Sequence, residues 1–466
     1  MCWCRYGGAW LHLFRHWALT ADSKPYRLNA DRRIWAIAGP AIVANSSAPL
    51  VGLVDTWVIG HLPGAVHLAS VGVGAAIFSF MFWAFGFLRM STTGLIAQAY
   101  GNKDDALIKR TLVQSVFLGL VFAAFLLVAQ SQILWLGVEA LGPPESTTGF
   151  IDDYFSIRIW SAPASLFIFS LTGYLFGTTQ AKAALWLQLI LNVSNGILNL
   201  IFVLGFDMGV SGIALGSVLA EWIAAIFGVY LLGKNFEFRE LMDTIRDKLN
   251  WRFSQLNKLL SANMYIFLRT LVLMTALALI TRNAATLGEE ALGANQVLMN
   301  FLLLISLGLD AFAHAAEAFV GAAYGRRNRA EMRFWIGRTS LWAGVTALLY
   351  SLTFLMAGQN LINTLTNIEE VRAIAVVGLP VMILMPIFAV WCYQFDGIFI
   401  GVTSGRGMLI TMIAAFAIYL LVLTPLTAEY GFKGLWIAVL IFMTSRGLMQ
   451  VLYYPFIEKK MARAGA

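Results

Sequence analysis

The chain has 466 residues, of which 59% are hydrophobic and only 12% charged, with a formal net charge of +7. Its mean hydropathy is +0.75, whereas soluble domains carry roughly 25% charged residues, so the composition excludes an ordinary soluble protein. The apolar stretches last about 20 to 30 residues without strict alternation, which favours membrane-spanning helices over barrel strands. Three scattered cysteines, Cys2, Cys4 and Cys392, do not form a disulfide framework.

Apolar stretches between polar breaks predict an all-α integral membrane protein with twelve transmembrane helices. In chain order they cover residues 34–60, 66–98, 107–136, 150–177, 184–204, 209–233, 257–287, 291–323, 332–358, 371–400, 407–427 and 432–456. Several exceed the roughly 20 residues that cross a bilayer, so tilted or kinked helices are expected. Residues 1–33 lack the apolar core and cleavage site of a signal peptide and are interpreted as a cytoplasmic tail.

Lysines and arginines are concentrated in one set of breaks: the N-terminal tail and the breaks near 102–110, 234–258 and 325–338. The opposite set holds only Arg282, Arg372 and Lys433. By the positive-inside rule, both termini and the central break are predicted to be cytoplasmic, in a multi-pass protein of the inner (cytoplasmic) membrane. The basic charge is therefore interpreted as a topology signal, and no nucleic-acid partner is expected.

The chain repeats itself at an offset of 224 residues. "GAVHLASVG" at 64–72 aligns with "GEEALGANQ" at 288–296, and "AQAYGNKDDA" at 97–106 aligns with "GAAYGRRNRA" at 321–330. One offset for separated segments indicates two homologous six-helix lobes related by a pseudo-two-fold axis along the membrane normal. The predicted organisation is a lobe at 34–233, a cytoplasmic linker at 234–256, a lobe at 257–457 and a tail at 458–466. In transporters built from two parallel repeats of this kind, the substrate cavity lies between the lobes.

Apart from the ends of the predicted spans, few charged side chains lie at membrane depth, and each would cost on the order of 3 kcal/mol if it faced lipid. Each must therefore face a cavity, a partner or the interior of a lobe, and an internal ion pair is the alternative to a functional role. The residues concerned are Asp55, Arg89, Arg158, Glu221, Arg269, Asp310, His314, Glu317, Asp396 and Arg446.

Asp55 interrupts the apolar run "PLVGLVDTWVIG" on the first predicted helix, downstream of Pro40 and Pro49. Each proline removes a backbone donor and can bend the helix. A carboxylate in a low dielectric can take up and release a proton as access alternates. Its counterpart at offset 224 is Leu279, so the two lobes are not equivalent.

Asp310, His314 and Glu317 share one face of the eighth predicted helix, because their spacing is i, i+4 and i+7. One helix supplies at most part of a metal site, and no His or Cys cluster elsewhere completes one, so no metal is expected. The stripe is interpreted either as a polar cavity wall for cation binding or proton relay, or as an internal network with Arg269. Asp396 is a further candidate for the cavity or relay.

Several segments resemble the multidrug and toxic compound extrusion (MATE) family: "GPAIV…LVDTWVIG", "AQAYG", "NGILNLIFVLGFDMGVSGIALGS" and "QFDGIFIGVTSG". The "FDGIFIG" stretch is most similar to the DinF branch. The resemblance runs from about residue 30 to 457. It implies a V-shaped pair of six-helix bundles, monomeric and surrounded by lipid, that exports small amphipathic, often cationic, organic compounds in exchange for a cation, with no cofactor besides that ion.

The resemblance also implies a polar site for a proton or a sodium ion in the N-terminal bundle. Residue by residue, this site falls on Asp55, Tyr154, Asn195, Asn199 and Ser217. Asn199 stands where the family often has a second acid. A sodium ion benefits from charge as well as from several oxygens, so the loss of an acid favours proton over sodium coupling.

Two alternatives remain open. A flippase for lipid-linked or other amphipathic precursors would need a cationic cavity, lined by Arg89, Arg269 and Arg446, where an antiporter for cations would present acids. A membrane enzyme would need paired acidic metal motifs or a histidine–acid pair at the membrane surface. No D-x-x-D motif occurs and His314 lies in mid-helix, so a transporter is expected rather than an enzyme.

Overall fold

The computed structural model describes residues 26–59 and 65–463, apart from a few side chains, that of Asp55 among them. Most of the predicted N-terminal tail lies outside this description. The described residues are almost entirely helical and contain no strand. Ten helical stretches among them are long and apolar enough to cross a membrane, as predicted for an all-α membrane protein.

The N-terminal lobe contains more helices than predicted spans. It comprises α2 (Ala30–Ile59), α3 (Ala65–Ala84), α4 (Phe87–Gly101), α5 (Asp105–Val128), α6 (Gln130–Leu141), α7 (Glu145–Arg158), α8 (Ala162–Gly177), α9 (Ala181–Leu200) and α10 (Gly209–Asn235). The second predicted span is broken between α3 and α4, and the third between α5 and α6. The fourth is broken between α7 and α8, where a short 3₁₀ turn intervenes. A membrane helix tolerates such breaks where neighbouring protein satisfies the freed backbone groups.

The linker carries the short helix α11 (Phe238–Arg246), and the C-terminal lobe follows it. That lobe comprises α12 (Phe253–Thr286), α13 (Glu289–Gly325), α14 (Arg329–Leu365), α15 (Glu369–Gly401) and α16 (Gly405–Arg463). The last two predicted spans are two helices that share the label α16 and meet at a kink, where Gly431 is non-helical at φ 56° and ψ −133°. Glycine takes this conformation without the steric cost that a side chain would bring.

The 224-residue repeat is visible in the backbone. Left-handed φ values, which are uncommon for residues other than glycine, recur at that offset: Lys103 (58°) with Arg327 (56°), and Thr179 (62°) with Thr403 (51°). The helix caps recur as well, because Asp104 accepts a hydrogen bond from the backbone N–H of Leu107 and Asn328 from that of Glu331. Each half therefore builds the same turns at the same places.

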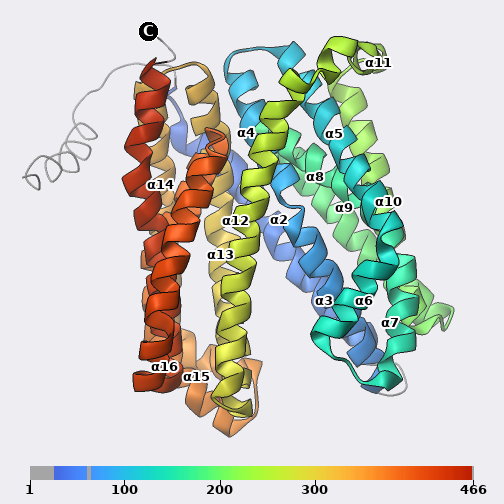
Figure 1. Ribbon diagram of the computed structural model, residues 1–466, viewed down its shortest axis with the longest axis vertical. Helices are drawn as coiled ribbons and strands as arrows, with labels where there is room; N and C mark the ends of the chain where they lie inside the picture. The colour runs from blue at the N-terminus through green and yellow to red at the C-terminus, as the bar shows by residue number, and fades with distance from the viewer. Residues whose placement is uncertain (1–25, 60–64, 464–466) are drawn as a thin grey trace, which may run out of the picture.

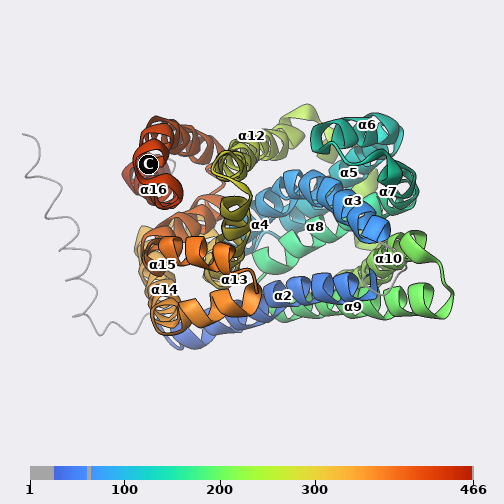
Figure 2. The same ribbon diagram turned by 90° about the horizontal axis from the view of Figure 1, so that it is seen from below.

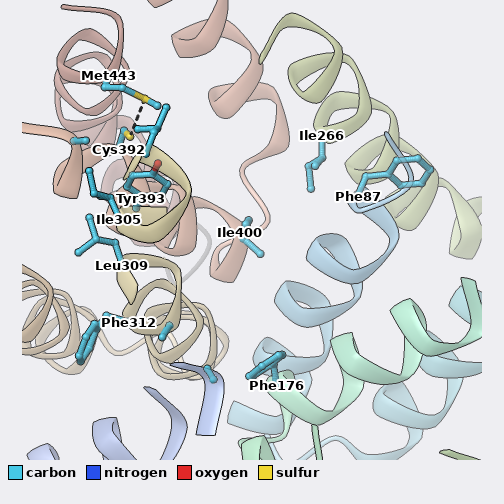
Figure 3. Close-up of a cluster of buried hydrophobic side chains, with 14 of the residues drawn as sticks. Phe87, Phe176, Ile266, Ile305, Leu309, Phe312, Cys392, Tyr393, Ile400 and Met443 are labelled. Carbon is cyan, nitrogen blue, oxygen red and sulfur yellow. Dashed lines mark hydrogen bonds between the residues drawn. The ribbon is translucent and has the colours of Figure 1, made fainter. Parts of the chain in front are cut away.

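Close backbone packing forms the centre of each lobe. A methyl group on Gly173 of α8 would lie 2.7 Å from the carbonyl oxygen of Arg89 on α4, and one on Gly397 of α15 would clash with that of Ala313 on α13. These pairs are again 224 residues apart, and small residues are what allow membrane helices to approach this closely. Buried side chains of α13, α15 and α16, including Ile305, Tyr393 and Met443, fill the C-terminal core (Figure 3).

The two lobes lie side by side (Figure 1). Their ribbons approach one another toward the end where α11 and the C-terminus lie, here called the linker end, and diverge toward the opposite end. The first helix contacts both lobes: Asn45 of α2 donates to the carbonyl of Leu307 on α13, whereas Ser47 accepts from Asn192 on α9. Figure 2 shows α2 extending beside α9 from the region of α13 and α14.

Candidate functional site

Three of the predicted coupling residues form a buried hydrogen-bonded chain in the N-terminal lobe. The Nδ2 of Asn195 donates to the Oγ of Ser217 at 2.8 Å, and the Nδ2 of Asn199 lies 3.3 Å from the Oδ1 of Asn195. The asparagines come from successive turns of α9, and the serine comes from α10. All three side chains are buried. The arrangement supplies neutral amide and hydroxyl groups and no charge of its own.

The segment of α2 that carries Asp55 packs against α9 near this chain. Its side chain is outside the described part of the structure, so the predicted coupling role of that carboxylate stays a prediction. A methyl group on Gly196 of α9 would be 3.8 Å from Cγ1 of Val54, the residue before Asp55. The α2 helix continues through Pro40 and Pro49, and their predicted role in bending it is likewise untested.

Tyr154 lies on the α3 side of the same bundle. Its ring is buried against Gly74, where a methyl group would be 2.5 Å from Cδ1, and near Phe78 at a centroid distance of 6.1 Å. One turn along α7, Arg158 donates to Oε1 of Glu221 at 2.5 Å, and Ser165 also donates to that carboxylate. This pair ties α7, α8 and α10 together, which makes Arg158 and Glu221 an internal ion pair.

In the C-terminal lobe, Asp396 and Arg269 belong to a buried network. Asp396 on α15 accepts hydrogen bonds from Arg269 of α12, from Nη2 of Arg446 at 2.9 Å and from Nε2 of Gln450 at 2.5 Å. The two arginine side chains are only 5% and 4% exposed. Arg269 is thus paired with Asp396 and makes no direct ion pair with the described residues of the α13 stripe, and the two interpretations of that stripe stay predictions.

Two residues of the α13 stripe contact the other lobe. Nη1 of Arg89, from α4, lies 3.3 Å from Oε2 of Glu317, and Nδ1 of His314 lies 3.2 Å from Oε1 of the same carboxylate. The ring of Phe176, from α8, stacks on His314 with a centroid distance of 4.5 Å. Asp310 is half-buried one turn away, and no described residue donates a hydrogen bond to it.

The lobes touch closely at glycines near the linker end. A methyl group on Gly101 would clash with the carbonyl of Ala322, and one on Gly325 would clash with that of Gln98. These two contacts are related by the 224-residue repeat. On the same helices, a methyl group on Gly321 would be 2.7 Å from Cβ of Ala97. We call this set, Ala97, Gln98, Gly101, Gly321, Ala322 and Gly325, the glycine contact. Sequence reasoning did not identify it, although it falls in the segment that carries the repeat.

No group of three or more His, Cys, Asp or Glu residues within the described ranges could hold a metal ion. The polar groups that are present suit proton exchange, binding of a monovalent cation or recognition of an organic cation.

Known proteins match this chain over both of its halves. A family model described as MatE matches residues 40–203 and 266–426, one segment in each half. The chain is 38% identical over 421 residues to the DNA damage-inducible protein F of Escherichia coli (strain K12), covering 90% of this chain and 91% of that protein. It is 28% identical over 436 residues to Protein DETOXIFICATION 44, chloroplastic, of Arabidopsis thaliana, covering 89% and 80%.

Solved structures share the fold. A crystal structure of MATE in the straight conformation superposes with a TM-score of 0.83 at 19% identity, covering 92% of this chain and 96% of that one. The outward-facing conformation of a multidrug resistance MATE family transporter gives 0.81 at 18% identity, with the same coverage. At this identity the likeness shows the twelve-helix fold and carries no information on substrate.

Proposed function

The chain belongs to the multidrug and toxic compound extrusion (MATE) family of transporters, and from this premise we propose that it exports small amphipathic organic cations in exchange for protons. It would act as a monomer in the inner membrane, with the linker end in the cytoplasm, as the distribution of lysine and arginine favours. The lobes would then meet at the cytoplasmic end, and because their ribbons diverge toward the opposite end, we propose that the described arrangement is an outward-facing state.

The observation that carries proton coupling is the neutral chain of Asn195, Asn199 and Ser217 on α9 and α10, against which the Asp55 segment of α2 packs. Glu221, the one acid of this bundle that is buried among the residues whose side chains are described, is already engaged by Arg158. Asp55 would therefore provide the coupling charge of its lobe alone. One protonatable carboxylate is sufficient for proton exchange, whereas a sodium ion is held better by several oxygens with more negative charge.

The charges between and within the lobes favour export of cations over the flippase alternative. Each arginine that a flippase could offer to an anionic headgroup already contacts a carboxylate: Arg89 contacts Glu317, and Arg269 and Arg446 share Asp396. Half-buried Asp310 is the acid of the α13 stripe without such a partner among the described residues, and it is proposed to face the cationic substrate.

The test is efflux of a fluorescent organic cation from proteoliposomes in which pH and sodium gradients are imposed separately. We expect the pH gradient alone to drive transport and Asp55→Asn to reduce that transport to the passive leak. Asp153→Asn, at an exposed acid of α7, is the matched control and should transport normally. Normal transport by Asp55→Asn would remove the coupling role of Asp55. Transport driven only by sodium would overturn the choice of ion.

A further inference from the structure

His314 lies beside the ion pair of Arg89 and Glu317, which joins the two lobes. It comes from α13 of the C-terminal lobe, and its neighbours come from three helices: Arg89 of α4, Phe176 of α8, and Glu317 one turn further along α13. The side chains of Arg89, His314 and Glu317 are 18%, 11% and 2% exposed. The only ion pair across the lobes in this group is the one between Arg89 and Glu317, as far as the structure describes the chain.

The Nδ1 atom of His314 lies near one hydrogen-bond donor and one hydrogen-bond acceptor. Nη1 of Arg89, a hydrogen-bond donor, is 3.5 Å from it, and Oε1 of Glu317, an acceptor, is 3.2 Å from it. An imidazole nitrogen either accepts a hydrogen bond through its lone pair or donates one through its proton. Without a proton, Nδ1 can accept from Arg89 of the other lobe. With a proton, it can donate only to Glu317 of its own lobe.

A second proton on the ring also changes the charge balance. With a neutral imidazole, Arg89 and Glu317 form a pair with no net charge between the lobes. With an imidazolium, two cations share one carboxylate, and Arg89 is repelled by the ring that lies 3.5 Å away. The other charged groups nearby do not replace this pairing, because Asp396 is occupied by Arg269 and Arg446. Asp310, one turn away, faces the same side of α13 and attracts the imidazolium and Arg89 alike.

The position of this group connects the charge to the closure of the lobes. Glu317 precedes Gly321 of the glycine contact by one helical turn, and Gly94, which follows Arg89 on α4, packs against the carbonyl of Ile400 in the other lobe. The pair of Arg89 and Glu317 therefore adds an electrostatic attraction next to a contact of small residues and backbone, where the side chain of Gln98 also donates hydrogen bonds to Gly401 and Thr403 of the other lobe. Loss of that attraction weakens the contact at the linker end.

We propose that His314 is a second proton-binding site, located between the lobes, and that its protonation releases Arg89 from Glu317 and lets the lobes separate at the linker end. This inference rests on the proposed proton-coupled antiport. It assigns to the proton a direct effect on conformation: an outward-open transporter that takes up a proton here is freed to open toward the cytoplasm. Histidine suits this role because imidazole changes charge between about pH 5 and 8.

The experiment measures the conformation of the full-length protein in lipid nanodiscs. Spin labels at positions 145 and 370, exposed residues in the first turns of α7 and α15, report the separation of the lobes at the end opposite the linker. Cys2 and Cys4 are replaced by serine, and Cys392 is buried. We expect the ratio of long to short distances in the parent protein to fall about tenfold from pH 8.5 to pH 5.5.

Two substitutions of His314 give opposite results. His314→Gln keeps a neutral polar group and should change the ratio less than about twofold over the same range. His314→Lys carries a charge throughout and should favour the short distance at both pH values. His67→Gln, at a half-buried histidine of α3, is the matched control and should respond like the parent protein. Arg89→Gln removes the pair from the other lobe and should also favour the short distance at both pH values.

The inference fails if His314→Gln responds to pH as the parent protein does, or if the parent protein does not respond. It also fails if Asp55→Asn alone abolishes the response, since Asp55 would then be the conformational trigger while the proposed antiport stands. Conversely, the two proton sites have separate roles, as proposed, if two results are found together. Asp55→Asn lacks pH-driven transport but keeps the change of spin-label distances with pH, whereas His314→Gln loses that change.

Discussion

Two carboxylates of the C-terminal lobe each bind two arginines, but the arginines are buried in one case and exposed in the other, and this difference predicts different costs of removing the negative charge. Replacing Asp396 by Asn would leave Arg269 and Arg446 side by side with 5% and 4% of their side chains exposed. Removing one partner from a buried ion pair costs about 3–5 kcal/mol, because the remaining charge cannot reach water. We therefore expect Asp396→Asn to lower the free energy of unfolding by about 3 kcal/mol or more.

Glu458→Gln is the matched control for this prediction. Glu458 binds Arg329 and Arg333, whose side chains are 46% and 50% exposed. Both arginines can hydrate when the charge is removed, so the expected loss is below about 1 kcal/mol. The assay is equilibrium unfolding in mixed micelles of a mild detergent and dodecyl sulfate. Equal losses for the two variants would refute the argument from burial. Loss of efflux without loss of stability in Asp396→Asn would instead make Asp396 part of the transport pathway.

Three further predictions concern the lobe contact, the linker end and the coupling ion. Gly325→Val places a side chain against the carbonyl of Gln98 and should shift the spin-label distances toward the short population, whereas Gly344→Val, with open space around it, should not. Hydrogen bonds from Arg338 hold the pKa of Asp31 below its usual value, so this carboxylate stabilises the fold above its unfolded pKa of about 3.9, and the stabilisation is lost as the pH falls through the lowered value. The loss of unfolding free energy caused by Asp31→Asn should thus be constant above about pH 5 and vanish in stronger acid. Because the side chains of Asp31 and Arg338 are both partly exposed, this loss should stay below about 1 kcal/mol. A loss that grows in acid would contradict the prediction. Asn199→Asp supplies a second acid and should allow a sodium gradient to drive efflux in the proteoliposome assay; no gain with sodium would show that charge at this position does not select the ion.

The sequence predicted the architecture because its signals are local or repetitive. The spans follow from hydropathy, and the duplication follows from an offset that the backbone then reproduces in its turns, as at Lys103 and Arg327. The breaks within the second and fourth predicted spans had no such signal. The residues around Phe85 and Gly86 are as apolar as the helix on either side, and what makes a break tolerable there is the surrounding protein, which hydropathy does not contain.

The candidate sites were predictable to different degrees. Asn195, Asn199 and Ser217 were grouped by resemblance to a family, and the structure brings them together. The partners of the intramembrane charges were not predictable from helical spacing, since spacing assigns a residue to a face of its own helix and does not say which helix lies opposite. Arg269 shows this: it pairs with Asp396, 127 residues away on α15.

The contacts between the lobes nevertheless follow a rule that the repeat contains. Where a helix meets its own copy near a pseudo-two-fold axis, each residue lies close to its counterpart, so contacts across the axis join positions about one repeat length apart. Ala97 and Gly321 of the glycine contact differ by the repeat length itself. Arg89 is 225 residues from His314 and 228 from Glu317. The ion pair of Arg158 and Glu221 has a separation of 63 residues and lies within one lobe. In a chain with a 224-residue repeat, a separation near that length therefore marks a charge pair as one that joins the lobes, and such a pair must break when they rock apart.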